Sequence, residues 1–183
     1  MTPVYTRPWV ASAQVCDKVI VSYTVEMTGN HHRRKKIRLP IEAYSEPGSV
    51  WHVTMCAIDR LNSFSNNALA ESMCTQVLWY GHRYNVMMHA YCVVPDHLHL
   101  IAQVNDQSLI KMLGAFKSFT TRIWWKQGGE GQLWQESFYD HGIRRVEDFD
   151  EAVGYLLNNP VRAGLVSDQA EYPWRGGAVF EDK

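Results

Sequence analysis

Residues 86–104 read VMMHAYCVVPDHLHLIAQV, two apolar stretches separated by a Pro-Asp pair. Residues 86–94 and 97–104 are short, apolar and rich in β-branched side chains, which is typical of buried strands. Proline and aspartate between two such stretches favour a turn. The segment therefore predicts two strands that follow each other closely along the chain.

The sequence on both sides of this segment predicts the remaining elements. Residues 50–58 and 137–144 have the composition of strands. Apolar side chains recur every three or four positions in 66–84 and 108–126, which indicates helices. Residues 148–158 predict a last helix, and Pro160 should end it at Asn159.

The predicted order is strand, helix, strand, strand, helix, strand, helix. Its first six elements are the split βαβ pattern of a ferredoxin-like α+β sandwich, an antiparallel sheet with helices on one face. The other face would then be free for a site. The last helix, which carries Tyr155, would follow at the C-terminal end.

Composition limits the class of protein. The 183 residues are 46% hydrophobic and 20% charged, which favours one domain with a real core and excludes a disordered or collagen-like chain. The four cysteines form no CxxC pair, and the longest apolar run is far too short to span a membrane. With no signal peptide visible, we expect a cytoplasmic protein without a membrane partner.

Charge is distributed unevenly along the chain. Residues 1–40 have a net charge of +5 and residues 41–183 a net charge of −6, within a total of −1. We therefore expect a basic extension over 1–40 and a separate domain over 41–183. The cluster Arg33, Arg34, Lys35 and Lys36 is either a solvated arm or a contact to the phosphate backbone.

His97-Leu98-His99 is the most informative triplet for chemistry. On a strand, the two imidazoles would project from one face and could hold one divalent metal with open ligand positions. The alternative is a pair of hydrogen-bonded structural histidines. A mixed histidine and oxygen site would favour Mg²⁺ or Mn²⁺ over a structural zinc.

Tyr155 and Asn159 are four residues apart and would share a helix face. Tyr155 could then be a nucleophile and Asn159 an oxygen ligand to the same metal. The alternative is a core tyrosine and an asparagine that ends a helix.

These motifs occur together with several others in an order that resembles the REP-associated tyrosine transposases, which are single-tyrosine HUH transposases. The resemblance covers about residues 44–175. It rests on Val93–Ile101, Tyr155–Val166, Trp51–Thr54, Phe116–Arg122, Trp134-Gln135, Phe138–His141 and Tyr172–Trp174.

The resemblance implies an enzyme that cuts and rejoins single-stranded DNA containing hairpins, such as palindromic repeats. In that family the histidines bind a divalent metal, Mg²⁺ or Mn²⁺, and the tyrosine keeps the 5′ end as a phosphotyrosine. Carried over, His97 and His99 are metal ligands, Tyr155 is the nucleophile and Asn159 completes the metal site. The chain would act as a monomer or homodimer, at the nucleoid when bound. The alternative is a domesticated protein that binds a DNA or RNA hairpin without cutting it.

One position departs from the family pattern, which usually has asparagine where Asp96 stands. Asp96 could alter the metal site or serve as a further carboxylate, but we favour a role in capping the turn. His52 is interpreted as structural, and His141 as structural rather than a phosphate or metal contact. Trp125 is a candidate for stacking on bases. Candidate contacts to the DNA backbone are Lys111, Lys117, Arg122, Arg144 and Arg162, each with a solvated surface position as the alternative.

Overall fold

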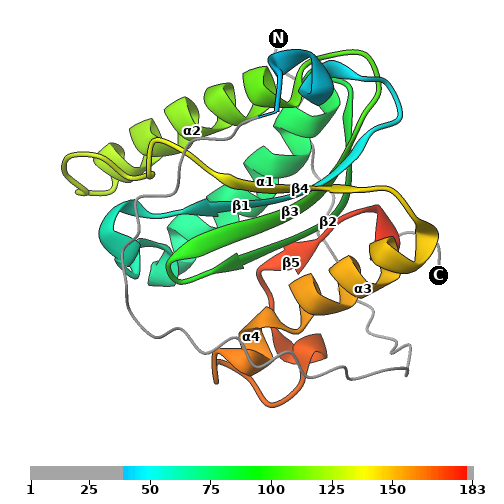
Figure 1. The fold of residues 1–183 in the computed structure, drawn as a ribbon. Helices are drawn as coiled ribbons and strands as arrows, with labels where there is room; N and C mark the ends of the chain where they lie inside the picture. The colour runs from blue at the N-terminus through cyan, green and yellow to red at the C-terminus, as the bar shows by residue number, and fades with distance from the viewer. Residues whose placement is uncertain (1–38, 181–183) are drawn as a thin grey trace, which may run out of the picture. The chain divides into compact units, whose positions relative to one another are not determined.

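An antiparallel sheet organises residues 39–180, the part of the chain that the computed structural model describes (Figure 1). The strand order in this part is β4-β1-β3-β2-β5. The strands are β1 (Val50–Cys56), β2 (Val86–Val94), β3 (His97–Val104), β4 (Tyr139–Ile143) and β5 (Arg175–Gly176). The helices are α1 (Asn67–Arg83), α2 (Leu109–Lys126), α3 (Val146–Leu157) and α4 (Asn159–Arg162), with short 3₁₀ turns η1 (Ile41–Ser45), η2 (Ile58–Arg60), η3 (Ser63–Ser65), η4 (Gln169–Glu171) and η5 (Ala178–Phe180).

The first four strands and the two long helices follow the order β1-α1-β2-β3-α2-β4. All their pairings are antiparallel, which confirms the predicted ferredoxin-like α+β sandwich. β2 and β3 pair up to the Pro95-Asp96 turn, where Val94 lies opposite His97. β5 adds a fifth strand beside β2.

The register between β1 and β3 decides which side chains share a face. Thr54 lies opposite His99, and Cys56 lies opposite His97. β4 continues the sheet on the other side of β1, with His141 opposite His52. Because directly opposed residues project from the same face, these side chains gather on one face of the sheet.

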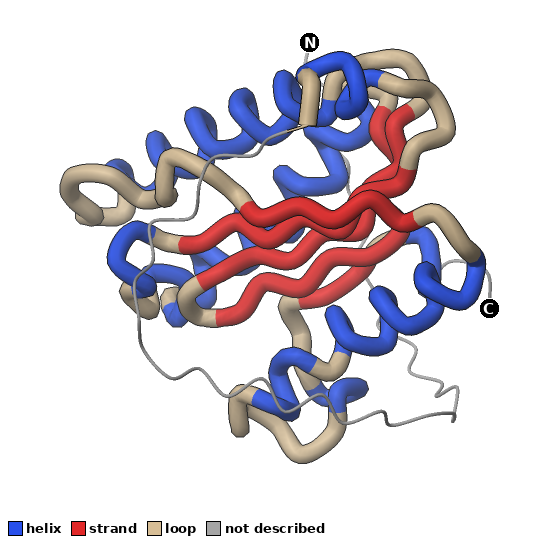
Figure 2. The backbone as a smooth tube through the Cα atoms, in the orientation of Figure 1, coloured by secondary structure: helices blue, strands red, loops and turns tan. Residues whose placement is uncertain are grey.

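Helices α1 and α2 lie side by side and cover the opposite face (Figure 2). The Asn66 side chain caps α1 by accepting hydrogen bonds from the backbone N–H groups of Ala68 and Leu69. The predicted apolar stripes of both helices are buried in the main core. They include Leu69, Met73, Val77, Leu109, Met112, Leu113 and Phe116.

Helix α3 packs on the face that the sequence interpretation left free. Its buried Leu156 joins a second apolar cluster with Cys92 and Ile101 from the sheet. Burial on both faces explains why β2 and β3 are apolar without strict alternation. The tyrosine helix is therefore a packed part of the fold, and only part of this face is open to solvent.

The predicted end of the last helix needs a correction. Helix α3 starts at Val146 and ends at Leu157, and Asn159 then begins a separate helix, α4. Pro160 does not exclude helical geometry here, because a proline in the first turn of a helix removes no intrahelical hydrogen bond.

The predicted basic extension lies mostly outside the described residues, and the prediction about membrane spans can be compared only with the described part of the chain. The basic cluster at 33–36 and most of the predicted extension over 1–40 fall outside residues 39–180. Within the described part of the chain, no helix is long and apolar enough to cross a bilayer.

Candidate active site

The two histidines of β3 point at each other. Nε2 of His97 and Nε2 of His99 are 2.9 Å apart, and the rings are nearly perpendicular. A proton on one nitrogen can be shared across this distance, and a cation bound by both lone pairs can replace that proton. The prediction that both side chains project from one face is confirmed.

The Asp96 carboxylate fixes the orientation of His97. Its Oδ1 lies 2.6 Å from Nδ1 of His97, and its Oδ2 lies 3.0 Å from an Arg60 guanidinium nitrogen. A carboxylate accepts a proton from Nδ1 and so leaves Nε2 as the lone-pair nitrogen, an arrangement typical of metal-binding histidines. The interpretation of Asp96 as a turn cap was wrong, because its partners are a histidine and an arginine.

His99 is held by two side chains from β1. Thr54 Oγ1 lies 2.9 Å and His52 Nε2 lies 3.3 Å from its Nδ1. His99 is only 4% exposed, and burial holds its pKa well below the usual value. Burial, with a smaller contribution from His141, lowers the pKa of His52 to about 4. Burial also lowers the pKa of His97, although Asp96 opposes that effect.

Tyr155 lies over this imidazole cluster from α3. Its ring centroid is 6.0 Å from that of His52 and 6.0 Å from that of His99. The side chain is 44% exposed, so a large substrate can reach it. The Arg162 guanidinium lies 4.7 Å from the Tyr155 ring centroid.

Asn159 joins the tyrosine helix to the histidines. Its Nδ2 donates to the backbone carbonyl of Tyr155 at 3.0 Å, and its side chain also hydrogen-bonds His99. The fold thus brings together Tyr155, His97, His99 and Asn159, four residues that the sequence singled out.

The donor set fits a divalent metal with an incomplete protein shell. His97 and His99 offer converging Nε2 atoms while their Nδ1 atoms are engaged by other groups. Across residues 39–180, no group of three or more His, Cys, Asp or Glu side chains is arranged to hold an ion. An ion here would therefore take two imidazoles and an amide, with positions left for substrate oxygens.

Comparison with known proteins identifies the family of the chain. Residues 48–156 match the family model described as Transposase IS200 like. The chain belongs to this transposase family.

Two similar proteins belong to one group within this family, the REP-associated tyrosine transposases. A REP-associated tyrosine transposase of Escherichia coli K12 is 29% identical over 90 residues, which cover 48% of this chain and 52% of that protein. A Haemophilus influenzae protein named in the same group is 27% identical over 139 residues, 69% of this chain and 78% of that protein. The predicted resemblance to the REP-associated tyrosine transposases is thus confirmed.

A solved structure shares the fold. The structure of a REP-associated tyrosine transposase bound to a REP hairpin has a TM-score of 0.61 and 21% identity to this IS200-like family member, covering 72% of this chain and 78% of that one. At this level of identity the likeness concerns the fold.

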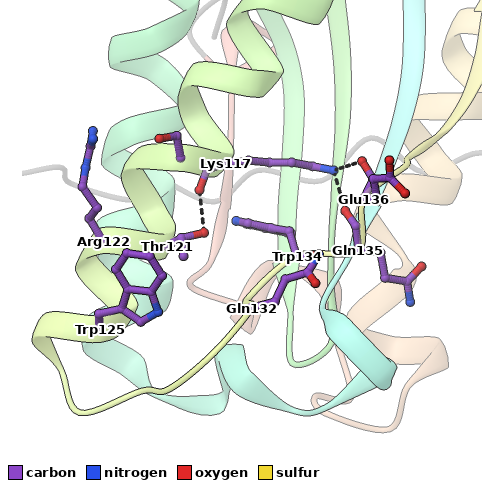
Figure 3. A pocket seen from close by; sticks show the side chains of 9 residues that line it. Lys117, Thr121, Arg122, Trp125, Gln132, Trp134, Gln135 and Glu136 are labelled. Atoms are coloured by element: carbon purple, nitrogen blue, oxygen red, sulfur yellow. Dashed lines mark hydrogen bonds between the residues drawn. The ribbon is translucent and has the colours of Figure 1, made fainter.

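The candidate DNA contacts of this family member lie in several separate places on the structure. Arg162 is beside Tyr155. Lys117, Arg122 and Trp125 line a pocket between α2 and the segment that follows it (Figure 3). Lys111 and Arg144 are exposed, and they lie neither beside Tyr155 nor in the lining of this pocket.

Lys117 has a different environment from the one predicted. Its ammonium group donates to the backbone carbonyls of Gln135, Glu136 and Ser137 at 2.9, 3.4 and 3.2 Å. An ammonium has three donors, so these bonds use all of them. Lys117 therefore holds the 135–137 segment in this conformation, and its contact with DNA stays a prediction.

Sequence reasoning missed Thr54 and Arg60, and it favoured other roles for two further residues of the site, His52 as structural and Asp96 as a turn cap. The alternation of Trp51-His52-Val53-Thr54 could have placed His52 and Thr54 on one face of β1. No sequence pattern indicated that Arg60 belongs to the site. Asp59 and Arg60 both have positive φ, 49° and 55°, and side-chain patterns do not reveal such a backbone.

Proposed function

We propose that the chain is a metal-dependent endonuclease and strand transferase for single-stranded DNA, with Tyr155 as its nucleophile. The observation that carries the proposal is the position of the Tyr155 ring, 6.0 Å from the ring of His99, whose Nε2 converges on that of His97. A nucleophile beside an open metal site is an arrangement suited to phosphoryl transfer.

The covalent step is a transesterification. The phenol oxygen of Tyr155 forms a bond to the scissile phosphorus, and the bond from phosphorus to the 3′ oxygen breaks. The phenol loses its proton and the departing 3′ oxygen gains one. The products are a 5′-phosphotyrosine and a free 3′-hydroxyl, and the reverse attack by a 3′-hydroxyl rejoins a strand without a nucleoside triphosphate.

The residues around Tyr155 support this role. When bound by His97, His99 and Asn159, a divalent ion supplies positive charge beside the scissile phosphate. Asp96 and Thr54 hold the two imidazoles with their Nε2 atoms facing each other. Burial keeps both histidines neutral, which is the form that binds a metal.

The substrate we propose is DNA with a hairpin beside a single strand. Support comes from membership of the transposase family and from the REP hairpin in the related structure. The exposure of Tyr155 also suits an unpaired strand, whose backbone can approach the histidine pair. The proposal extends to palindromic repeats as the natural source of such hairpins.

The test is formation of a covalent adduct. Purified protein is incubated with a panel of fluorescent hairpin oligonucleotides with single-stranded flanks, with Mn²⁺ or with EDTA, and run on a denaturing gel. We expect a shifted protein–DNA band that needs the metal and disappears in Tyr155→Phe. Tyr84→Phe is the matched control, because Tyr84 stacks on Tyr80 of α1, on the opposite side of the sheet.

Each alternative gives its own result. Adduct formation by Tyr155→Phe at the wild-type rate would reject Tyr155 as the nucleophile. Tight binding of hairpins without any adduct, at any metal concentration, would instead favour a protein that binds hairpins without cutting them.

A further inference from the structure

We propose that the pocket between α2 and the segment 132–136 binds one unpaired nucleotide of the DNA strand that leaves the reaction centre. This inference rests on the proposed function and adds a second contact point for the same substrate. The pocket has a volume of about 410 Å³, within the range of roughly 300–1,000 Å³ typical of small-ligand sites.

Trp125 forms an aromatic wall of this nucleotide pocket. The side chain is 53% exposed, and its indole N–H donates to the carbonyl of Gly131 at 2.8 Å. The hydrogen bond fixes the orientation of the ring while leaving much of it accessible. An exposed indole with a fixed orientation is suited to stacking on a base, and such stacking tolerates any base.

The opposite wall is held rigidly in place. Figure 3 shows Trp125 and Thr121 on α2 across the hollow from Gln132, Trp134 and Gln135. The Trp134 indole N–H donates to Thr120 Oγ1 at 2.9 Å, and the Lys117 ammonium donates to the carbonyls of Gln135 and Glu136 in this wall and of the adjoining Ser137. These hydrogen bonds join the wall to α2, so the hollow exists before any ligand binds.

The polar lining suits a nucleotide. Arg122 also lines the pocket, but its guanidinium points away from the hollow and lies 5.6 Å from the Phe119 ring centroid (Figure 3). The amide side chains of Gln132 and Gln135 and the hydroxyl of Thr121 also line the pocket. An aromatic wall and amide groups together match a base and its hydrogen-bonding edge.

The pocket is joined directly to the reaction centre. The backbone N–H of Gln135 donates to the carbonyl of Cys56 at 2.9 Å, and that of Ala57 donates to the carbonyl of Asp96 at 2.8 Å. Cys56 lies opposite His97 in the sheet. One wall of the pocket is thus attached where β1 ends and β3 begins, which is the edge that carries the histidine pair. A strand whose phosphate lies at His97 can pass around this edge to Trp125.

The experiment locates the base that stacks on Trp125. Hairpin oligonucleotides carry the fluorescent base 2-aminopurine at one position at a time in each single-stranded flank. They are titrated with the full-length protein, either wild type or Trp125→Ala. We expect one position to be quenched on binding to the wild type and to recover its fluorescence in Trp125→Ala.

Affinity gives a second readout by anisotropy. Trp125→Ala should bind the flanked hairpin about tenfold more weakly, since stacking on one base contributes about that factor. It should bind the same hairpin without flanks as the wild type does. Trp125→Phe keeps an aromatic ring and should restore most of the affinity. Trp79→Ala is the matched control, because Trp79 is 50% exposed on α1 and does not line the pocket.

The outcomes distinguish this proposal from the previous one. Wild-type quenching and affinity in Trp125→Ala, with the adduct still formed, would reject the nucleotide pocket and leave the nucleophile assignment intact. Equal weakening for flanked and unflanked hairpins would also reject it, because the residue would then contact the duplex. Absence of any adduct with the wild-type protein would reject the proposed function, whereas quenching at one position would still support the pocket.

Discussion

Oδ1 of Asp96 lies 2.6 Å from Nδ1 of His97, so a carboxylate stands directly behind one half of the histidine pair. The other oxygen of the same carboxylate is held by Arg60. Such a contact raises the electron density on the imidazole and prevents its rotation. Asp96 would therefore orient His97 for the proposed cation.

The first prediction concerns this carboxylate. We expect Asp96→Ala to weaken Mn²⁺ binding about 10- to 100-fold, the usual effect of removing the partner of a metal-binding histidine. Asp96→Asn should weaken it less, because the amide oxygen can still accept from Nδ1. Isothermal titration with Mn²⁺ measures both, and Asp106→Asn in the exposed turn after β3 is the control. Equal affinity in Asp96→Ala and wild type would show that Asp96 does not act through His97.

The second prediction concerns the other histidine. Thr54→Val keeps the shape of the side chain and removes the 2.9 Å contact to Nδ1 of His99. We expect about 1 kcal/mol lower stability and slower adduct formation, which high Mn²⁺ should partly restore. Thr75→Val removes a comparable hydroxyl contact on the exposed side of α1 and should leave the adduct rate unchanged. A Thr54→Val enzyme with the wild-type Mn²⁺ dependence would contradict the assigned role.

The third prediction concerns Arg162, whose guanidinium lies 4.7 Å from the Tyr155 ring centroid. A contact of this kind contributes about 0.5–1 kcal/mol at an exposed site. We expect Arg162→Ala to slow adduct formation several-fold at saturating DNA, because the tyrosine loses one of its supports. If Arg162 contacts only phosphate, the rate at saturation stays unchanged, and the salt dependence of binding decreases by about one unit of slope.

The fourth prediction concerns pH and the metal-free protein. Burial lowers the pKa of His52 to about 4, below its unfolded value of about 6.5, so the unfolded chain takes up this proton more readily. The free energy of unfolding is therefore highest above pH 6.5 and falls as the pH decreases towards 4. His52 alone accounts for up to about 3 kcal/mol of this loss.

Urea unfolding in EDTA at pH 7 and pH 5 measures this effect. We expect His52→Gln to show a smaller difference between the two pH values than the wild type. His82→Gln, a change near the end of α1, should keep the full difference. An equal pH dependence in wild type and His52→Gln would rule out His52 as a source of the loss.

The core elements were predictable because their signals are local. The hairpin of β2 and β3, the stripe of α1 and the stripe of α2 each repeat over many residues, and their predicted bounds agree with the structure within one or two positions. The start of α3 at Val146 and the separate helix α4 were not predicted. Helix ends depend on a few residues, and Pro160 is compatible with either a stop or a first turn.

The site was only half predictable, for a different reason. His97, His99, Tyr155 and Asn159 belong to short motifs whose members are two or four residues apart. Asp96 differs, because its second partner, Arg60, reaches it from another turn with a left-handed backbone. His52 acquires its role only through the register of three strands, and one strand alone does not fix that register.

The strand order restrains the helix that carries Tyr155. β4 and β5 are the two outer strands of the sheet, so the connection through α3 and α4 crosses its whole width over the histidine face (Figure 1). Tyr172 follows this crossing, and its hydroxyl donates to the carbonyl of Val93 in β2 at 2.8 Å. This hydrogen bond attaches the end of the connection to the sheet. Tyr155 thus lies on a connection that is held to the sheet at both ends. Such a connection can adopt fewer orientations than a free terminal helix. Part of the entropy that Tyr155, the proposed nucleophile, would lose on alignment with a phosphate is therefore already lost when the chain folds.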